Sequence, residues 1–177
     1  MEYLPAILLT LGIIVVIVAA MLFGWRNQQR RHGNFAPPVP VPDKETLGQP
    51  LLEVEGQYVS TALAQDALTR VNARTLGDRG NALIQVYPTG VAWFREGAEN
   101  FFIPTHQLTG VRYSSGQSGK FVEKDGLVTV DWLLGQPPQF VPLAVQTGFR
   151  PRYAAEKKPL RDALAELTAS PTKENNA

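Results

Sequence analysis

The sequence predicts a mainly β protein with some α-helix. It would have an N-terminal transmembrane helix, a linker, and a seven-stranded curled sheet or barrel capped by a C-terminal helix. Three observations predict this fold. An uncharged apolar run lies near the N-terminus, short alternating apolar segments separated by turn residues fill the middle, and a stretch of helical periodicity closes the chain. The 177 residues leave room for one such domain and its accessories.

The apolar run extends from Ala6 to Phe23 and contains no charged residue. With its flanks it reaches the ~20 residues that a helix needs to cross the hydrocarbon core, and Trp25 suits the headgroup region. A buried core helix would rarely be apolar on every face. A signal peptide would begin with basic residues and end at a small-residue cleavage site, which this run lacks. Residues 1–25 are therefore predicted to be an uncleaved membrane anchor.

The charged flanks of this run predict its orientation. No Lys or Arg precedes it, whereas Arg26, Arg30 and Arg31 follow it, and positive flanks stay on the cytoplasmic side. We therefore expect a single-pass protein of the plasma membrane, with the N-terminus outside and the remaining chain in the cytoplasm. The arginines could also attract anionic headgroups at about 1 kcal/mol each, although the simpler interpretation is that they only set the topology.

Residues 26–50 are predicted to be a basic stop signal followed by a proline-rich linker. Its second part contains Pro37, Pro38, Pro40, Pro42 and Pro50. Because proline favours extended chain, the segment is expected to be a semi-rigid spacer between membrane and domain. The alternative is a proline-rich ligand that docks on an aromatic groove.

Residues 51–169 carry the pattern of an antiparallel β domain, in which short apolar or alternating segments are separated by Gly, Pro, Asp and Asn. The predicted strands are Val54–Ser60, Ala82–Tyr87, Val91–Arg95, Phe101–Ile103, Val111–Ser114, Leu127–Leu134 and Phe140–Val145. The turn at Pro88-Thr89-Gly90 joins the second and third strands into a hairpin, because glycine supplies the positive φ.

Two helices are predicted within the same domain. Over Ala64–Arg74 the apolar residues recur at helical spacing, with Gly77 as a stop signal. Near the C-terminus, Leu160, Leu164 and Leu167 follow a helical repeat. The last eight residues, 170–177, have no apolar periodicity and are expected to form a flexible tail.

Seven strands followed by one amphipathic helix fit the pleckstrin-homology (PH) superfold, and short segments make the resemblance more specific. They are VEGQYVST (54–61), LGDR (76–79), FFIP (101–104), GVR (110–112), GKFVE (119–123), GLVTVDWLLG (126–135) and TGFR (147–150). In this order and spacing, the chain resembles the actinobacterial family of single-span membrane proteins with a PH-like domain. The resemblance implies a fold and a location far more than an activity.

Residue types that carry catalysis or bind metals are scarce. The absence of cysteine excludes disulfides, thiolate nucleophiles and Cys-based metal sites. Residues 114–121 are similar to a phosphate-binding loop, but Ser114 and Phe121 replace its first glycine and its magnesium-binding hydroxyl. His106 has no sequence neighbours that would complete a metal site or a triad. We therefore predict no enzymatic activity, cofactor or metal, and the net charge of +1 argues against nucleic-acid binding.

Basic residues provide the remaining candidate site. Five of them cluster where the last strand leads into the closing helix, and two others could join them on one positive surface that faces headgroups or an acidic partner. The five are Arg150, Arg152, Lys157, Lys158 and Arg161, and the two are Arg79 and Lys120. The simpler interpretation is a solvated rim without a partner.

These observations favour a non-enzymatic interaction or scaffolding module, tethered to the inner face of the plasma membrane, that binds a protein partner. Two alternatives remain open. One is a sensor of anionic lipid at the membrane surface, which would use the basic residues. The other is an accessory subunit of an export or transport system.

Overall fold

A computed structural model describes residues 11–22, 35–66, 68–71, 75–117, 119–121 and 123–169. The chain divides into two compact units, one up to Asn34 and one from Phe35 onward. In the first unit, residues 11–22 form a helix in which every residue is exposed. No helix within the described ranges combines the length and the apolarity needed to cross a membrane. Predictions for the following residues lie outside the described part of the chain: Ala6, Phe23, Trp25, Arg26, Arg30, Arg31 and the tail 170–177.

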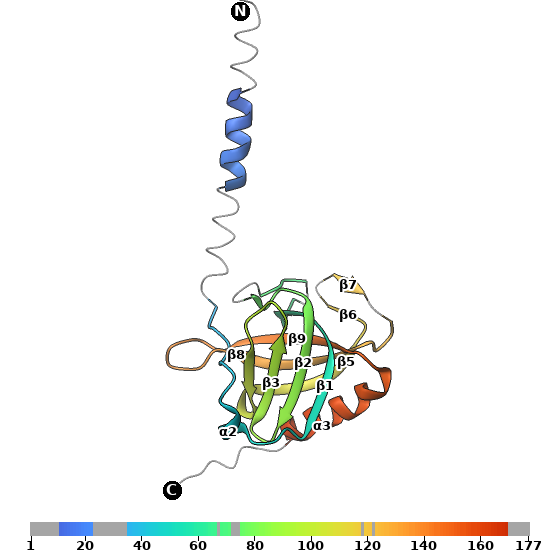
Figure 1. The fold of residues 1–177 in the computed structure, drawn as a ribbon. Helices are drawn as coiled ribbons and strands as arrows, with labels where there is room; N and C mark the ends of the chain where they lie inside the picture. The colour runs from blue at the N-terminus through green and yellow to red at the C-terminus, as the bar shows by residue number, and fades with distance from the viewer. Residues whose placement is uncertain are drawn as a thin grey trace, which may run out of the picture. The chain divides into compact units, whose positions relative to one another are not determined.

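The second unit is built on one antiparallel sheet of seven strands in the order β4-β3-β2-β1-β9-β8-β5 (Figure 1). Its strands are β1 (Leu52–Leu63), β2 (Gly80–Tyr87), β3 (Gly90–Arg95), β4 (Phe101–Pro104), β5 (Leu108–Ser114), β8 (Leu127–Leu134) and β9 (Leu143–Pro151). A separate two-stranded ladder joins β6 (Gly116–Gln117) to β7 (Lys120–Phe121). Because β4 and β5 remain the two edges, the sheet curls without closing into a barrel.

The long strand β1 belongs to both halves of the sheet. Its residues from Leu52 to Tyr58 pair with β2, whereas those from Gly56 to Leu63 pair with β9. The register with β9 shifts between Tyr58 and Ser60. Such irregularities bend a strand and increase its local twist. The two halves of the sheet can therefore face each other across one core.

Aromatic side chains fill that core. Trp93 stacks on Phe101 with ring centroids 5.6 Å apart, and Phe101 stacks on Trp132 at 6.0 Å. Tyr58 and Phe149 meet Trp93 edge-on at 5.7 and 5.8 Å. Each such pair contributes about 0.5–1.5 kcal/mol beyond the burial of its surface. Since β3 and β4 supply two of these rings and β8 and β9 supply two others, the cluster fastens the two halves of the sheet together.

The helix predicted near the C-terminus is confirmed as α3 (Lys157–Ala169). It follows the short 3-10 turn η3 (Ala154–Glu156). Its buried residues are Leu160, Leu164 and Leu167, which are the leucines of the predicted repeat. The helix packs chiefly against β5, and also against β8 and β1, so it closes one side of the core.

Six predicted strands coincide with strands of the main sheet, and the seventh is shifted. It was expected over Phe140–Val145, but β9 runs from Leu143 to Pro151. Two polar residues in β9, Gln146 and Thr147, interrupt the apolar pattern although both are buried. They tolerate burial because their side chains form hydrogen bonds inside the domain, a pairing that no local pattern predicts.

The helix predicted over Ala64–Arg74 is wrong in the part that the structure describes. There the chain forms turns and an isolated bridge at Arg70. The carboxylate of Asp66 accepts hydrogen bonds from the N–H of Leu68, at 3.0 Å, and from the hydroxyl of Thr69, at 2.6 Å. These bonds stabilise a turn in place of a helix, and the bond from Thr69 is the main reason why the pKa of Asp66 is lowered.

The proline-rich segment packs on the domain from residue 35, so it is not a free spacer up to Pro50. The N–H of Phe102 in β4 donates to the carbonyl of Val39 at 2.7 Å, which covers the edge of the sheet. The short helix α2 (Lys44–Leu47) buries Leu47 against the outer face of the sheet. Prolines suit such a cover because they offer no N–H groups for further strand pairing.

Candidate functional site

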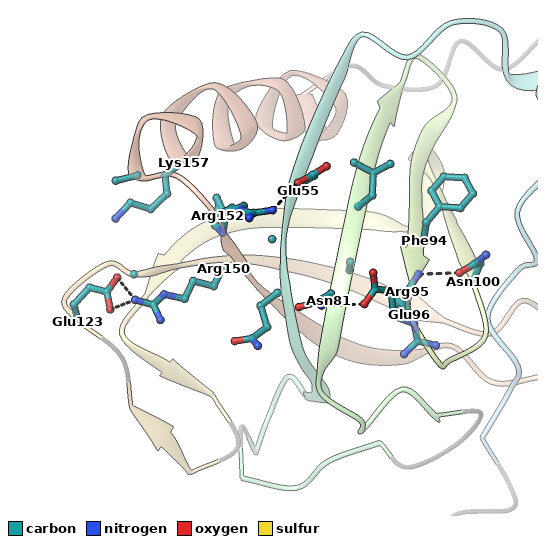
Figure 2. A pocket seen from close by; sticks show the side chains of 17 residues that line it. Glu55, Asn81, Phe94, Arg95, Glu96, Asn100, Glu123, Arg150, Arg152 and Lys157 are labelled. Atoms are coloured by element: carbon teal, nitrogen blue, oxygen red, sulfur yellow. Dashed lines mark hydrogen bonds and ion pairs between the residues drawn. The ribbon is translucent and has the colours of Figure 1, made fainter.

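A broad, open groove runs over the outer face of β1, β2 and β3 and has a volume of about 1060 Å³ (Figure 2). Two rows of side chains cross its floor. In the first row, Glu55 of β1 pairs with Leu83 of β2, which pairs with Phe94 of β3. The second row, which starts with Gln57, contains Asn81 and Glu96, and the side-chain amide of Asn81 donates to the Glu96 carboxylate at 2.9 Å.

The groove forms here because strand side chains alternate between the two faces of a sheet. In β1, Val54 and Tyr58 point into the core and are nearly fully buried, so Glu55 and Gln57 point outward. Val41 and Leu47, from the segment that covers β4, pack on the same outer face in a cluster that also includes Phe94. The groove is therefore the uncovered part of this face.

Ion pairs form the wall on the side of β9. Arg152 contacts Glu55, with Nη1 3.2 Å from Oε2. Arg150 donates from Nη2 to both carboxylate oxygens of Glu123, each at 3.0 Å (Figure 2). The pKa of Glu123 is lowered, first by a hydrogen bond from its own backbone N–H and then by Arg150. The wall therefore carries two positive and two negative side chains, each paired with one of opposite sign.

These ion pairs are exposed, and a ligand could replace either member. The side chains of Arg152 and Glu55 are 64% and 67% exposed, and those of Arg150 and Glu123 are 44% and 54% exposed. Surface pairs of this kind contribute about 0–1 kcal/mol to stability. Opening one of them to receive a charged group would therefore cost little.

The predicted positive surface is only partly assembled. Arg150, Arg152 and Lys157 line the groove, and Arg79 reaches its floor by donating to the side-chain carbonyl of Gln57. Lys157 donates to the backbone carbonyl of Asp125 at 3.2 Å.

Two other predicted residues, Lys158 and Arg161, are not among those that line the groove. Lys158 and Arg161 lie on α3, and both pair with Asp162. The guanidinium of Arg161 also lies 5.4 Å from the ring centre of Tyr113, on the β5 side of the helix. The backbone of Lys120 belongs to β7, and the prediction for its side chain lies outside the described part of the structure.

Sequence reasoning missed the acidic half of the site, which consists of Glu55, Glu96 and Glu123. It also missed the apolar centre of the floor, Leu83 and Phe94, both of which are half-buried. A signal existed for Glu55, because it alternates with the buried Val54 of a predicted strand. The side chains beside it depend on strand register, which local patterns do not reveal. The surface is consequently mixed in charge.

His106 lies in the 3-10 turn η2 (Thr105–Gln107), and its Nε2 is 2.9 Å from Nε2 of Gln136. Across the positions that the structure describes, no group of three or more His, Asp or Glu residues is placed to hold a metal ion.

Comparison with curated proteins finds no match. Among solved structures, a chain of the 8S snRNP assembly intermediate is similar, with a TM-score of 0.48 and 12% sequence identity. The alignment covers 79% of this chain and 95% of that chain. A family model described as bacterial PH domain-like matches residues 36–165. The match begins in the proline-rich segment that covers β4, includes all seven strands of the main sheet and ends within α3. The chain therefore belongs to the bacterial PH domain-like family.

Proposed function

We propose that this protein is a non-enzymatic interaction module that is held at the plasma membrane and binds a protein partner through the groove. The observation that carries the proposal is the chemistry of the groove. A half-buried apolar centre, Leu83 and Phe94, continues the row that starts at Glu55 of the exposed Glu55–Arg152 pair, and Glu96 belongs to the neighbouring row (Figure 2). Recognition surfaces commonly combine a desolvated apolar centre with a polar rim.

The partner that fits this groove is a polypeptide segment that presents an apolar side chain together with charged groups of both signs. Its acidic group would meet Arg150 and Arg152, and its basic group would meet Glu96. Anionic lipid suits the groove less well, because Glu55 and Glu123 already offset the nearest cations. We therefore prefer a protein partner to the lipid-sensor alternative.

Photo-crosslinking would test the groove. A photoreactive phenylalanine analogue in place of Phe94 keeps an aromatic ring on the floor, and in native membranes we expect it to form a specific adduct with the partner. Arg152→Glu should lower the yield of that adduct by at least about tenfold, since like charges would then face each other. Exchanging both members of the pair, in the double variant E55R/R152E, should preserve the ion pair but leave the yield low.

Lys158→Glu provides the matched control, because Lys158 is 80% exposed and is not among the groove-lining residues. It should leave the adduct at its original yield. An equal loss with Lys158→Glu, or an unchanged yield with Arg152→Glu, would argue against the groove as the binding site.

The membrane location rests on the N-terminal sequence. The run from Ala6 to Phe23 is uncharged, and the arginines that follow it favour a cytoplasmic position for the rest of the chain. We therefore propose that the N-terminus lies outside and that the PH-like domain lies in the cytoplasm. Alkaline phosphatase fused after Ala177 should be inactive, because this enzyme requires an oxidising compartment for its disulfides. An active fusion would reverse the proposed orientation.

A further inference from the structure

Apolar side chains are exposed at one end of the PH-like domain. Among the described residues from 35 onward, five large hydrophobic side chains are exposed. Three of them lie in two connections between strands: Leu68, between β1 and β2, is 72% exposed, and Phe140 and Val141, between β8 and β9, are 41% and 90% exposed. Single exposed apolar residues need no explanation, but their concentration on neighbouring connections does.

The two connections leave the sheet side by side. The last residue of β1, Leu63, pairs with Val145 near the start of β9. The next N–H, that of Ala64, donates to the carbonyl of Ala144 at 3.0 Å. The N–H of Leu63 donates to the carbonyl of Thr69 at 3.0 Å, which anchors the turn that carries Leu68. We call the surface formed by Leu68, Phe140 and Val141 the loop face.

The chain joins the domain next to this face. Pro37 and Pro38 line a small hollow of about 170 Å³ together with Phe140. The contact is close: a Cβ atom added to Gly135 would lie 3.0 Å from Cβ of Ala36 and 3.1 Å from Cβ of Phe140. In Figure 1 the loop between β8 and β9 projects from the body of the domain. The segment that leads toward the N-terminus is therefore attached beside Phe140 and Val141, and Val141 is the most exposed large apolar side chain among the described residues of the domain.

We propose that the loop face rests on the lipid bilayer, with Val141 at the boundary between headgroups and acyl chains. The inference rests on the membrane location proposed above. Twelve residues, 23–34, separate the helix at residues 11–22 from the domain. At ~3.3–3.6 Å per residue they span at most about 40 Å, which keeps the attachment point and the adjacent loop within reach of the bilayer. Transfer of the exposed apolar groups out of water favours this contact.

The composition of the loop supports the same interpretation. Pro137, Pro138 and Pro142 restrict its backbone, so little conformational freedom is lost when it settles on a surface. No Asp, Glu, Lys or Arg lies between Gly135 and Pro142, so no charged side chain of the loop would have to leave water. The bilayer contact would fix the orientation of the domain and so the direction in which the groove opens.

Site-specific fluorescence would test the proposal, because the natural chain has no cysteine and single labels need no prior substitutions. The full-length variant Val141→Cys would carry an environment-sensitive nitrobenzoxadiazole label in phosphatidylcholine–phosphatidylglycerol vesicles. We expect quenching by nitroxide-bearing lipids to be several-fold stronger than for Leu51→Cys. Leu51 is a suitable control because it is 65% exposed and precedes the opposite end of β1.

A third variant, Ile17→Cys, reports on the N-terminal helix itself. Quenching at position 17 without quenching at position 141 would overturn the loop-face proposal and leave the proposed anchor standing. No quenching at either position would overturn both. A label at position 141 that is shielded from water but insensitive to nitroxide lipids would indicate a protein cover, including a second copy of this chain, and would also overturn the proposal.

Discussion

Replacing Arg95 by methionine is expected to lower the free energy of unfolding of the PH-like domain by about 3 kcal/mol or more. Arg95 is only 6% exposed. Its Nε donates to the carbonyl of Glu99 at 2.9 Å, and its Nη1 donates to the carbonyl of Thr75 at 2.9 Å. Methionine retains an unbranched chain but removes every donor, and hydrogen bonds to charged groups contribute about 1.5–3 kcal/mol each.

The guanidinium also contacts the aromatic core, which adds to the expected loss. It lies 4.8 Å from the ring centre of Tyr58 and 5.1 Å from that of Phe101. Burial lowers the pKa of Arg95 and raises the pKa of Tyr58, so the phenol remains a neutral donor, here to the carbonyl of Leu76 at 2.7 Å. The guanidinium of Arg95 thus remains positively charged at neutral pH, and backbone carbonyl groups and aromatic ring faces surround it.

Urea unfolding of residues 35–177, followed by tryptophan fluorescence, would measure the change. Arg152→Met is the matched control, because the side chain of Arg152 is 64% exposed and pairs with the exposed Glu55 at 3.2 Å. It should lose no more than about 1 kcal/mol. Similar losses in the two variants would contradict a special role for the buried arginine.

Replacing Gly56 by alanine is expected to destabilise the domain by about 3 kcal/mol or more, or to prevent folding altogether. Gly56 pairs with β2 and β9 at once. A Cβ atom there would lie 2.6 Å from Cζ of Phe149 and 2.9 Å from Cα of Pro151, and still closer to the carbonyl oxygen of Arg150. Because two of these atoms are backbone, only separation of β1 from β9 relieves the clash.

The same variant bears on the groove, since Gly56 lines it beside Arg150. We expect the crosslinking yield at the groove to fall together with the melting temperature. Gly110→Ala in β5 is the control. Its added Cβ would meet only the Asp131 side chain, at an ordinary 3.7 Å, and the unfolding free energy should change by less than about 1 kcal/mol. A Gly56→Ala domain as stable as the Gly110→Ala domain would refute the steric explanation.

Local patterns in the sequence predicted the elements with strong periodicity. The leucine repeat of α3 and the alternation in β8 were visible without a structure, because an amphipathic helix and a half-buried strand need only a core on one side. Ala64–Arg74 shows the limit of such patterns. Its apolar spacing favours a helix. In the structure β1 continues to Leu63, directly before this segment, and the carboxylate of Asp66 stabilises a turn there.

The groove was less predictable, because it joins residues that are distant in sequence. Arg152 and Glu55 are 97 positions apart and meet only because β9 pairs with β1. The basic residues could be identified one by one, but their acidic partners could not. The burial of Arg95 could not be predicted from the sequence either. Its hydrogen bonds go to carbonyl groups whose positions depend on the folded loops.

The cover that residues 35–47 form over β4 has a mechanical consequence. Tension on the N-terminal chain would load the contacts of residues 35–47, among them the hydrogen bond between Phe102 and Val39, before any bond of the main sheet, because these residues precede β1. Peeling these thirteen residues away would lengthen the tether by up to about 45 Å and leave the seven strands intact. The segment would therefore extend under tension before the strands of the main sheet separate.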